Sequence, residues 1–188
     1  WEKPDECIQS NVLGTTMALE YCRANNTKMI FISSYMYGNA DKLPTDEKAK
    51  IKIDNPLALS KAMGEEICKF YAKNYGIKIV ILRPSNIYGP GQKSYWLIPQ
   101  ILNKFKNKTI VINNLNIKRD LIYVSDFVEA IIKSISLKSD FEIINIGSGK
   151  SYSINEIIKT IQKIYWKNIL LKNKNINRKN EILHTKLD

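Results

Sequence analysis

The sequence contains a single histidine, His184, and only three cysteines among its 188 residues. One histidine cannot build a metal cluster or a histidine-based catalytic triad, because each of these needs several partners of defined type. Cys7, Cys22 and Cys68 lie in helix-like stretches without the spacing of metal ligands. We therefore expect no bound metal and three buried, free thiols, as in a cytoplasmic protein.

Long apolar runs are also lacking. No stretch approaches the roughly 18 consecutive apolar residues that a membrane span requires. The first residues, W-E-K-P-D-E, do not resemble a signal peptide. Because 44% of the residues are hydrophobic, the chain can form a packed core in one domain or two small ones. We expect a cytoplasmic protein that does not bind membranes.

Acidic residues are too few to balance the basic ones, and the formal net charge is +11. Such a charge is compatible with nucleic-acid binding. The lysines, however, are scattered, and only residues 167–179 concentrate them. The sequence has no zinc finger, helix-turn-helix signature or RNP-like aromatic strand. This pattern favours a solvated lysine surface and no nucleic-acid partner, and a basic nucleic-acid-binding module remains a remote alternative.

The central segment of the chain is a predicted helix over residues 54–76. It opens with Asn55 and Pro56, and proline is well tolerated in a first helical turn. It ends at Gly76, a typical residue after a helix C-terminus. Apolar residues at spacings of three and four predict one buried stripe, formed by Leu59, Met63, Ile67, Phe70 and Tyr71.

Other segments alternate around this helix. Residues 4–24 form a predicted first helix, in which Gly14 would permit close helix packing. Residues 28–33 and 77–82 are short apolar runs, which predict parallel strands buried on both faces. Ligands bind beyond the carboxyl ends of such strands, where Ser33 lies.

Three motifs surround the central helix. They are S-S-Y-M-Y-G at residues 33–38, Ser60-Lys61 in the helix, and R-P-S-N-I-Y-G-P-G at residues 83–91. In order and spacing they resemble the extended short-chain dehydrogenase/reductase family, the NAD-dependent nucleotide-sugar epimerases and dehydratases, including UDP-glucose 4-epimerases. Further resemblances are N-V-L-G-T at 11–15, R-D-L-I-Y-V-S-D at 119–126, N-I-G-S-G at 145–149 and the segment from Arg178 to Asp188.

The resemblance covers only the C-terminal two-thirds of a family member. It implies an α/β fold, with a partial Rossmann-like, doubly wound parallel sheet whose first strands are absent, and a small α/β substrate-binding lobe. Residues 1–91 would be the remainder of the NAD-binding domain and residues 92–188 the substrate-binding lobe, and the two interleave in the family.

The resemblance also implies site residues. The catalytic positions are Ser33, Lys61 and Asn11, and the NAD-binding positions are Lys61, Pro84 and Ser85. The positions for the diphosphate of a nucleoside diphosphate sugar are Asn86, Arg119 and Arg178. The planar guanidinium of Arg119 suits a diphosphate, with a salt bridge to Asp120 or Asp126 as the alternative. Asp126 is also the predicted N-cap of a helix over residues 127–137.

The sequence departs from the family in two ways. Leu57 stands where members carry the catalytic tyrosine, and leucine cannot exchange a proton. The sequence also lacks the G-x-x-G-x-x-G turn that holds the cofactor pyrophosphate and the acidic residue that binds the ribose. We therefore expect a truncated, inactive form that does not hold NAD by itself. The alternative is a non-catalytic relative that binds a nucleotide sugar or a partner subunit.

The strand predicted over residues 28–33 has no neighbouring partner strand on one side in this sequence. Unpaired apolar edges promote strand addition. We therefore expect a homo-oligomer, or a partner that supplies the missing strands.

Overall fold

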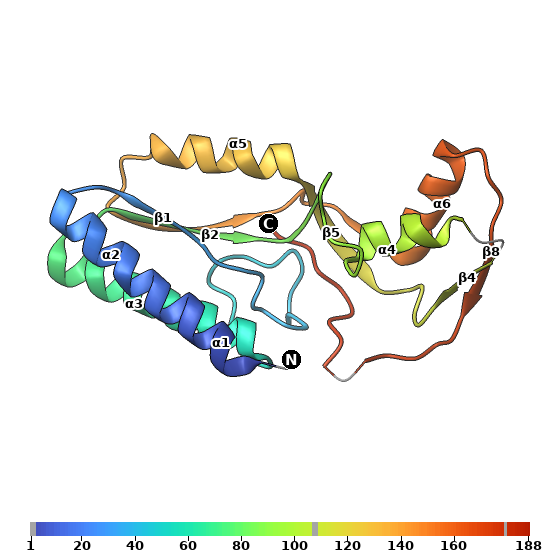
Figure 1. Ribbon diagram of the computed structural model, residues 1–188, viewed down its shortest axis with the longest axis horizontal. Coiled ribbons are helices and arrows are strands. Elements are labelled where there is room, and N and C mark those ends of the chain that lie inside the picture. The colour runs from blue at the N-terminus through green and yellow to red at the C-terminus, as the bar shows by residue number, and fades with distance from the viewer. Residues whose placement is uncertain (1–2, 107–108, 179) are drawn as a thin grey trace.

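The computed structural model describes residues 3–106, 109–178 and 180–188. Figure 1 shows helices on both faces of a parallel sheet, and a smaller group of helices and strands beside them. The predicted α/β fold class is confirmed. In the described part of the chain, no helix is both long and apolar enough to span a membrane.

The first sheet is parallel and has the order β1-β2-β6, formed by Met29–Ile32, Ile79–Pro84 and Phe141–Ile146. Every residue of β2 is buried, as expected of a central strand. β1 lies at an edge, since β2 is its only partner among the described residues, and Ile32 is 41% exposed. Burial on both faces is therefore confirmed for β2 and wrong for β1.

The first helical segment is confirmed, but it is not uniform. α1 (Pro4–Ile8) continues through η1 (Gln9–Leu13), which is a π-helical turn, into α2 (Gly14–Asn25). A β-carbon at Gly14 would meet nothing within 4 Å. The prediction that Gly14 permits close helix packing is therefore wrong.

Helix α3 (Pro56–Tyr75) has the predicted ends. The Asn55 side chain accepts a hydrogen bond from the backbone of Ala58, and Gly76 adopts a left-handed φ of 67°. The predicted apolar stripe is confirmed for Ile67 and Tyr71, which pack against the core, and wrong for Met63 and Phe70, which are exposed. The buried positions are instead mostly small, namely Ala58, Ser60, Gly64, Glu65 and Cys68.

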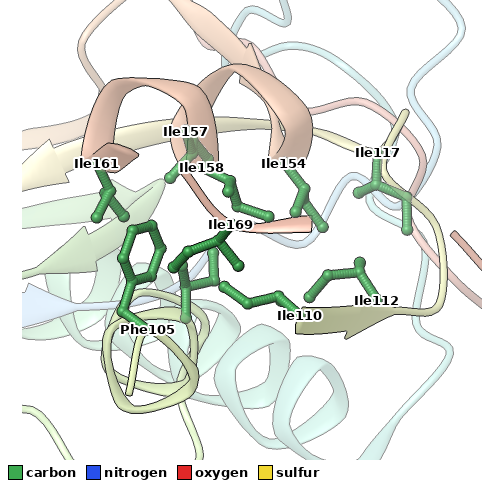
Figure 2. Packing of buried hydrophobic residues seen from close by; sticks show 10 residues of the cluster. Phe105, Ile110, Ile112, Ile117, Ile154, Ile157, Ile158, Ile161 and Ile169 are labelled. Atoms are coloured by element: carbon green, nitrogen blue, oxygen red, sulfur yellow. The ribbon is translucent and has the colours of Figure 1, made fainter. Parts of the chain in front are cut away.

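The smaller group has an isoleucine-rich core of its own. It consists of α4 (Leu97–Lys104), β4 (Thr109–Ile112), α6 (Ile154–Ile164) and β8 (Leu170–Asn173), and β4 pairs with β8 in parallel. In Figure 2, Ile154, Ile157, Ile158 and Ile161 of α6 lie across from Phe105, Ile110 and Ile112. A capping box of Ser153 and Glu156 begins α6.

A third sheet connects the two parts. β5 (Lys118–Tyr123) pairs with β3 (Asn86–Tyr88) in parallel and with β7 (Ser151–Ser153) in antiparallel register. Helix α5 (Val124–Ile135) follows β5 without a loop, so Tyr123 is its N-cap residue. Asp126 therefore lies inside the first turn of α5, and its prediction as N-cap is wrong.

Two elements that follow residue 91 lie with the first sheet. β6 pairs with β2, and α5 packs on the face opposite to α2 and α3 (Figure 1). Residues near the C-terminus then return across the molecule through single β-bridges from His184 to Lys118 and from Leu187 to Thr45. A functional division at residue 91 stays a prediction.

Candidate functional site

Lys61 lies at the carboxyl end of β1. Its Nζ donates a hydrogen bond to the carbonyl oxygen of Ile32 at 2.8 Å and lies 5.1 Å from the centre of the Phe31 ring. Burial lowers the pKa of the Lys61 ammonium. The structure thus places Lys61 against the residue that precedes Ser33, at the sheet edge where parallel sheets bind ligands.

Asn11 lies in the π-helical turn and contacts the same part of α3. Its Nδ2 donates to Ser60 Oγ at 2.9 Å, and that hydroxyl donates to the carbonyl oxygen of Leu57 at 3.0 Å. π turns within helices often occur at functional sites. Asn11 is therefore joined, through Ser60, to the turn of α3 that carries Leu57 and Lys61. Nothing in the residue pattern of 9–13 indicated the π turn.

Leu57 lies one helical turn before Lys61 and is half-buried. The two tyrosines of the 33–38 motif already use their hydroxyl protons in hydrogen bonds. The Tyr35 hydroxyl donates to the carbonyl oxygen of Gly38 at 3.0 Å, and the Tyr37 hydroxyl donates to Asn145 Oδ1 at 2.7 Å. Burial raises the pKa of both tyrosines, so each stays protonated and engaged.

A buried ion pair, Glu65 with Arg83, lies beneath Ser33. The side chain of Arg83 is only 4% exposed and that of Glu65 only 6%. Arg83 Nε donates to Glu65 Oε1 at 2.9 Å. The Ser33 hydroxyl donates to the same oxygen at 2.5 Å. The hydroxyl that the family resemblance assigns to catalysis is therefore held by Glu65.

The ion pair extends into a wider polar network. A second Arg83 nitrogen donates to the Tyr37 hydroxyl at 2.8 Å, which connects the pair to Asn145 on β6. Burial by itself would lower the pKa of Arg83, but the hydrogen bonds with Glu65 and Tyr37 outweigh it and raise that pKa. The network fixes β1, β2, β6 and α3 relative to one another.

Sequence reasoning missed Glu65. The available signal was its position one helical turn after Lys61, on the helix face shared with Ala58, Gly64 and Cys68. A carboxylate among small buried residues implies a buried cation as its partner. Arg83, which follows an entirely apolar strand segment, is that partner.

Pro84 and Ser85 lie at the end of β2. The backbone N–H of Ser85 donates to the carbonyl oxygen of Ile146 at 2.8 Å. The buried hydroxyl of Ser85 donates to Asp120 Oδ1 at 3.4 Å. Asn86 begins β3, in register with Leu121 of β5. The structure therefore turns the Ser85 hydroxyl inward and places Asn86 on the strand beside the one that carries Arg119.

Arg119 and Arg178 meet at one carboxylate, Glu181. Arg119 donates to Glu181 Oε1 at 3.0 Å and to the carbonyl oxygen of Ile182 at 2.6 Å, and Arg178 Nε lies 4.0 Å from Glu181 Oε2. Burial lowers the pKa of Arg119, partly offset by Glu181. The alternative pairing of Arg119 with Asp120 or Asp126 is therefore wrong. Arg178 remains 72% exposed, so one of the two guanidinium groups is accessible.

These residues do not form a complete NAD site. The described residues supply the strand ends around Lys61, Pro84 and Ser85. The chain has no G-x-x-G-x-x-G turn at a helix N-terminus to bind a pyrophosphate. In the described part of the chain, the outer edge of β1 is also unpaired. A bound NAD would need groups beyond those that these residues provide.

Comparisons with known proteins agree with this geometry. Residues 1–147 match the NAD dependent epimerase/dehydratase family. The chain is 39% identical over 160 residues to a putative UDP-glucose 4-epimerase of Methanocaldococcus jannaschii, covering 81% of this chain and 52% of that protein.

Solved structures give the same result. A UDP-N-acetylglucosamine 4-epimerase from Methanobrevibacter ruminantium, in complex with UDP-N-acetylmuramic acid, has a TM-score of 0.89 at 29% identity, covering 96% of this chain and 60% of that one. A UDP-glucuronic acid 4-epimerase from Bacillus cereus, in complex with UDP-glucuronic acid and NAD, has a TM-score of 0.85 at 27% identity, covering 96% and 59%. The chain thus spans little more than half the length of these proteins.

Proposed function

Because the chain belongs to the NAD dependent epimerase/dehydratase family, we propose that it binds a nucleoside diphosphate sugar, as a UDP-sugar 4-epimerase does. The observation that carries this proposal is the meeting of Arg119 and Arg178 at Glu181, beside the strand pair that includes Asn86. Guanidinium groups bind phosphate oxygens in a planar, two-pronged manner. Glu181 now balances the positive charges of Arg119 and Arg178. A bound diphosphate would replace Glu181 in that role.

In this proposal the two segments have different roles. Residues 92–188, together with Asn86, hold the sugar nucleotide, and the other residues of 1–91 carry what remains of the NAD-binding domain. Lys61, Pro84 and Ser85 would lie at one end of a bound NAD, which supplies hydride transfer in such enzymes. The B. cereus epimerase, whose structure contains NAD, supports this assignment by its similarity.

We further propose that the chain by itself does not catalyse turnover. We assign Asn11, Lys61 and Ser33 to catalytic positions from the family resemblance. Leu57 provides no exchangeable proton, and Ser33 donates its proton to Glu65. General acid–base catalysis contributes roughly 10²–10⁴-fold to a rate. A non-catalytic relative that still binds nucleotide sugars is the second candidate, and Leu57 is the observation that favours it.

A homo-oligomer is the partner arrangement that we propose. Large apolar side chains are exposed on the neighbouring helices α2 and α3 and on the η1 turn before them. They are Leu13, Met17, Tyr21, Met63 and Phe70, each 40–66% exposed. α2 and α3 are held together by a hydrogen bond from Tyr71 to Glu20. A second copy would present the same set about a twofold axis and so cover both surfaces at once.

A different surface would receive further strands. α5 exposes an apolar stripe of Val124, Val128, Ile132 and Ile135, and β1 leaves one edge unpaired in the described structure. Both features lie at the same sheet, since α5 covers one of its faces (Figure 1). We propose that this surface packs against an additional strand and helix from a partner polypeptide.

Calorimetric titration with UDP-glucose tests the nucleotide-sugar proposal. Each charged contact contributes on the order of 1.5–3 kcal/mol, so Arg119→Ala should weaken binding about tenfold or more. Lys133→Ala is the control, because Lys133 forms an exposed ion pair with Glu129 on α5. The proposal would be contradicted by equal heats of binding for Arg119→Ala and Lys133→Ala, or by heats with other polyanions that equal those with UDP-glucose at low and high salt. The site would then be a basic surface without specificity for a nucleotide sugar.

A further inference from the structure

Three lysines and the single histidine surround one depression outside the candidate nucleotide-sugar site. Its volume is about 410 Å³, and it is lined by Lys118, Gly149, Lys150, Ser151, Tyr152, His184 and Lys186. None of Arg119, Arg178 and Glu181 is among these residues. The depression thus has a different lining from the place where the two arginines meet, and the two places share β5 and the segment 181–186.

The backbone around this depression is held by several hydrogen bonds. Lys118 donates from its N–H to Leu183 at 2.9 Å and accepts from the N–H of Thr185 at 3.2 Å, which fixes His184 beside it. The Ser151 hydroxyl donates to the carbonyl oxygen of Thr185 at 2.9 Å. Hydrogen bonds that involve the backbone thus hold three separate segments together, and each segment contributes basic residues to the depression.

The charges in the depression are not balanced locally. Its lining contains no carboxylate, and within the described residues Lys118, Lys150 and Lys186 form no salt bridge. The carboxylate of Glu156 interacts with Lys118 only through space. That carboxylate already accepts hydrogen bonds from the N–H and hydroxyl of Ser153, at 2.7 and 2.6 Å. An anion from solution would supply the missing negative charge.

His184 lies beside these lysines and responds to their charges. Its Nε2 is buried and has no hydrogen-bond partner among the residues that the structure describes. Burial, and then the charges of Lys118 and Lys186, lower the pKa of His184. A bound anion would offset the charges of Lys118 and Lys186 and so raise the pKa of His184.

We propose that this depression is a second anion-binding site, which takes the phosphate or diphosphate group of a small molecule. Lysine ammonium groups bind phosphate as point charges, and three of them around one concave surface match a diphosphate better than a lone carboxylate. The proposal does not depend on the nucleotide-sugar site.

The histidine makes the proposal directly measurable, because the chain has only one. Its ring proton resonances can be followed by NMR during titration with inorganic pyrophosphate, with ionic strength kept constant by chloride. We expect a saturable shift and a higher pKa for His184. Lys150→Ala and Lys186→Ala should each weaken binding about tenfold, the factor that corresponds to 1.4 kcal/mol. Lys150 is exposed and Lys186 is half-buried, and amide spectra would verify that the variants fold.

Two further variants test whether binding is specific to this depression. Lys69→Ala removes the same charge from the exposed side of α3 and should leave pyrophosphate binding unchanged. Lys133→Ala, which removes an exposed charge from α5, should also leave the His184 shift unchanged. A parallel titration with UDP tells whether a nucleoside strengthens binding. The absence of a saturable shift, or equal weakening by Lys150→Ala and Lys69→Ala, would overturn the proposal.

Discussion

The hydroxyl of Ser33 donates its only proton to a carboxylate oxygen of Glu65, 2.5 Å away. That carboxylate also accepts from Arg83, so its position is set by the buried ion pair. A serine oriented in this way offers a substrate its lone pairs rather than its proton. Glu65 thus decides how Ser33 can act at the end of β1.

The first prediction concerns this ion pair. Glu65→Gln preserves the size of the side chain but leaves the Arg83 charge buried without its counter-ion. We expect the free energy of unfolding to fall by about 3–5 kcal/mol. Glu129→Gln breaks an exposed pair with Lys133 on α5, and should leave the free energy of unfolding nearly unchanged. Urea denaturation monitored by circular dichroism measures both, and losses of similar size would contradict the assigned role of Glu65.

The second prediction compares two helical glycines. A β-carbon at Gly64 would lie 2.6 Å from the Phe31 ring, so Gly64→Ala should destabilise the protein by about 1–3 kcal/mol. Gly14 has helical φ and open space around it, so Gly14→Ala should stabilise it by about 0.5–1 kcal/mol. Thermal unfolding of the two variants gives the signs. Stabilisation by both would mean that Phe31 moves aside freely.

The third prediction separates the two defects expected in catalysis. Leu57→Tyr should not produce epimerase activity in this chain, because its residues do not form a complete NAD site. Fusion behind the N-terminal part of an active relative should give activity with Tyr at position 57 and little with Leu. The assay is conversion of UDP-glucose to UDP-galactose with added NAD. Turnover by the Leu57→Tyr chain without the fusion would disprove the account of the cofactor site.

The fourth prediction follows from the environments of the thiols, all three of which are free. Cys68 is fully buried, and burial raises the pKa of its thiol to about 12. Because the thiolate is the reactive form, Cys68 should resist iodoacetamide at pH 8 while the half-buried Cys7 is labelled. Peptide mass spectrometry gives the order of labelling, with urea-unfolded protein as the reference. Early labelling of Cys68 would indicate that α3 opens easily.

The fifth prediction tests self-association through α2 and α3. Met17→Glu and Phe70→Glu place a charge in the exposed apolar surface and should shift the protein toward monomer in sedimentation equilibrium. Ile164→Glu changes an equally exposed side chain at the end of α6 and should leave the oligomer intact. A protein that is already monomeric at high concentration would argue against the proposed twofold contact.

The sequence predicted some local structure well. Asn55, Pro56 and Gly76 marked the ends of α3 because capping depends on residues next to each other in the chain. The buried face of α3 was not predictable in the same way. Periodicity assumes that buried residues are apolar, whereas Gly64 is buried to admit Phe31 and Glu65 is buried to pair with Arg83. Those partners lie far along the chain, and only the folded arrangement identifies them.

The candidate site shows the same limit. The motifs located Lys61, Arg119 and Arg178, and the structure shows that Ile32 holds Lys61 and Glu181 holds Arg119. The sequence did not predict Glu181 as the partner of Arg119, because Asp120 is adjacent in the chain and is the simpler choice. Asp120 instead accepts backbone hydrogen bonds from Ser148 and Leu187, at 2.8 and 3.0 Å. Competition between neighbouring carboxylates is decided by tertiary contacts.

The β-bridge between Thr45 and Leu187 has a consequence for biosynthesis. Thr45 exchanges backbone hydrogen bonds with Lys186 and Asp188, at 2.8 and 3.1 Å. At about 5–20 residues per second, a ribosome takes on the order of ten seconds to travel from Thr45 to Leu187. During that interval the emerging chain presents the Thr45 loop without these partners, and Asp120, once synthesised, lacks the backbone N–H of Leu187. Chaperones that bind nascent chains would therefore meet the Thr45 loop unpaired until residues 186–188 have been synthesised.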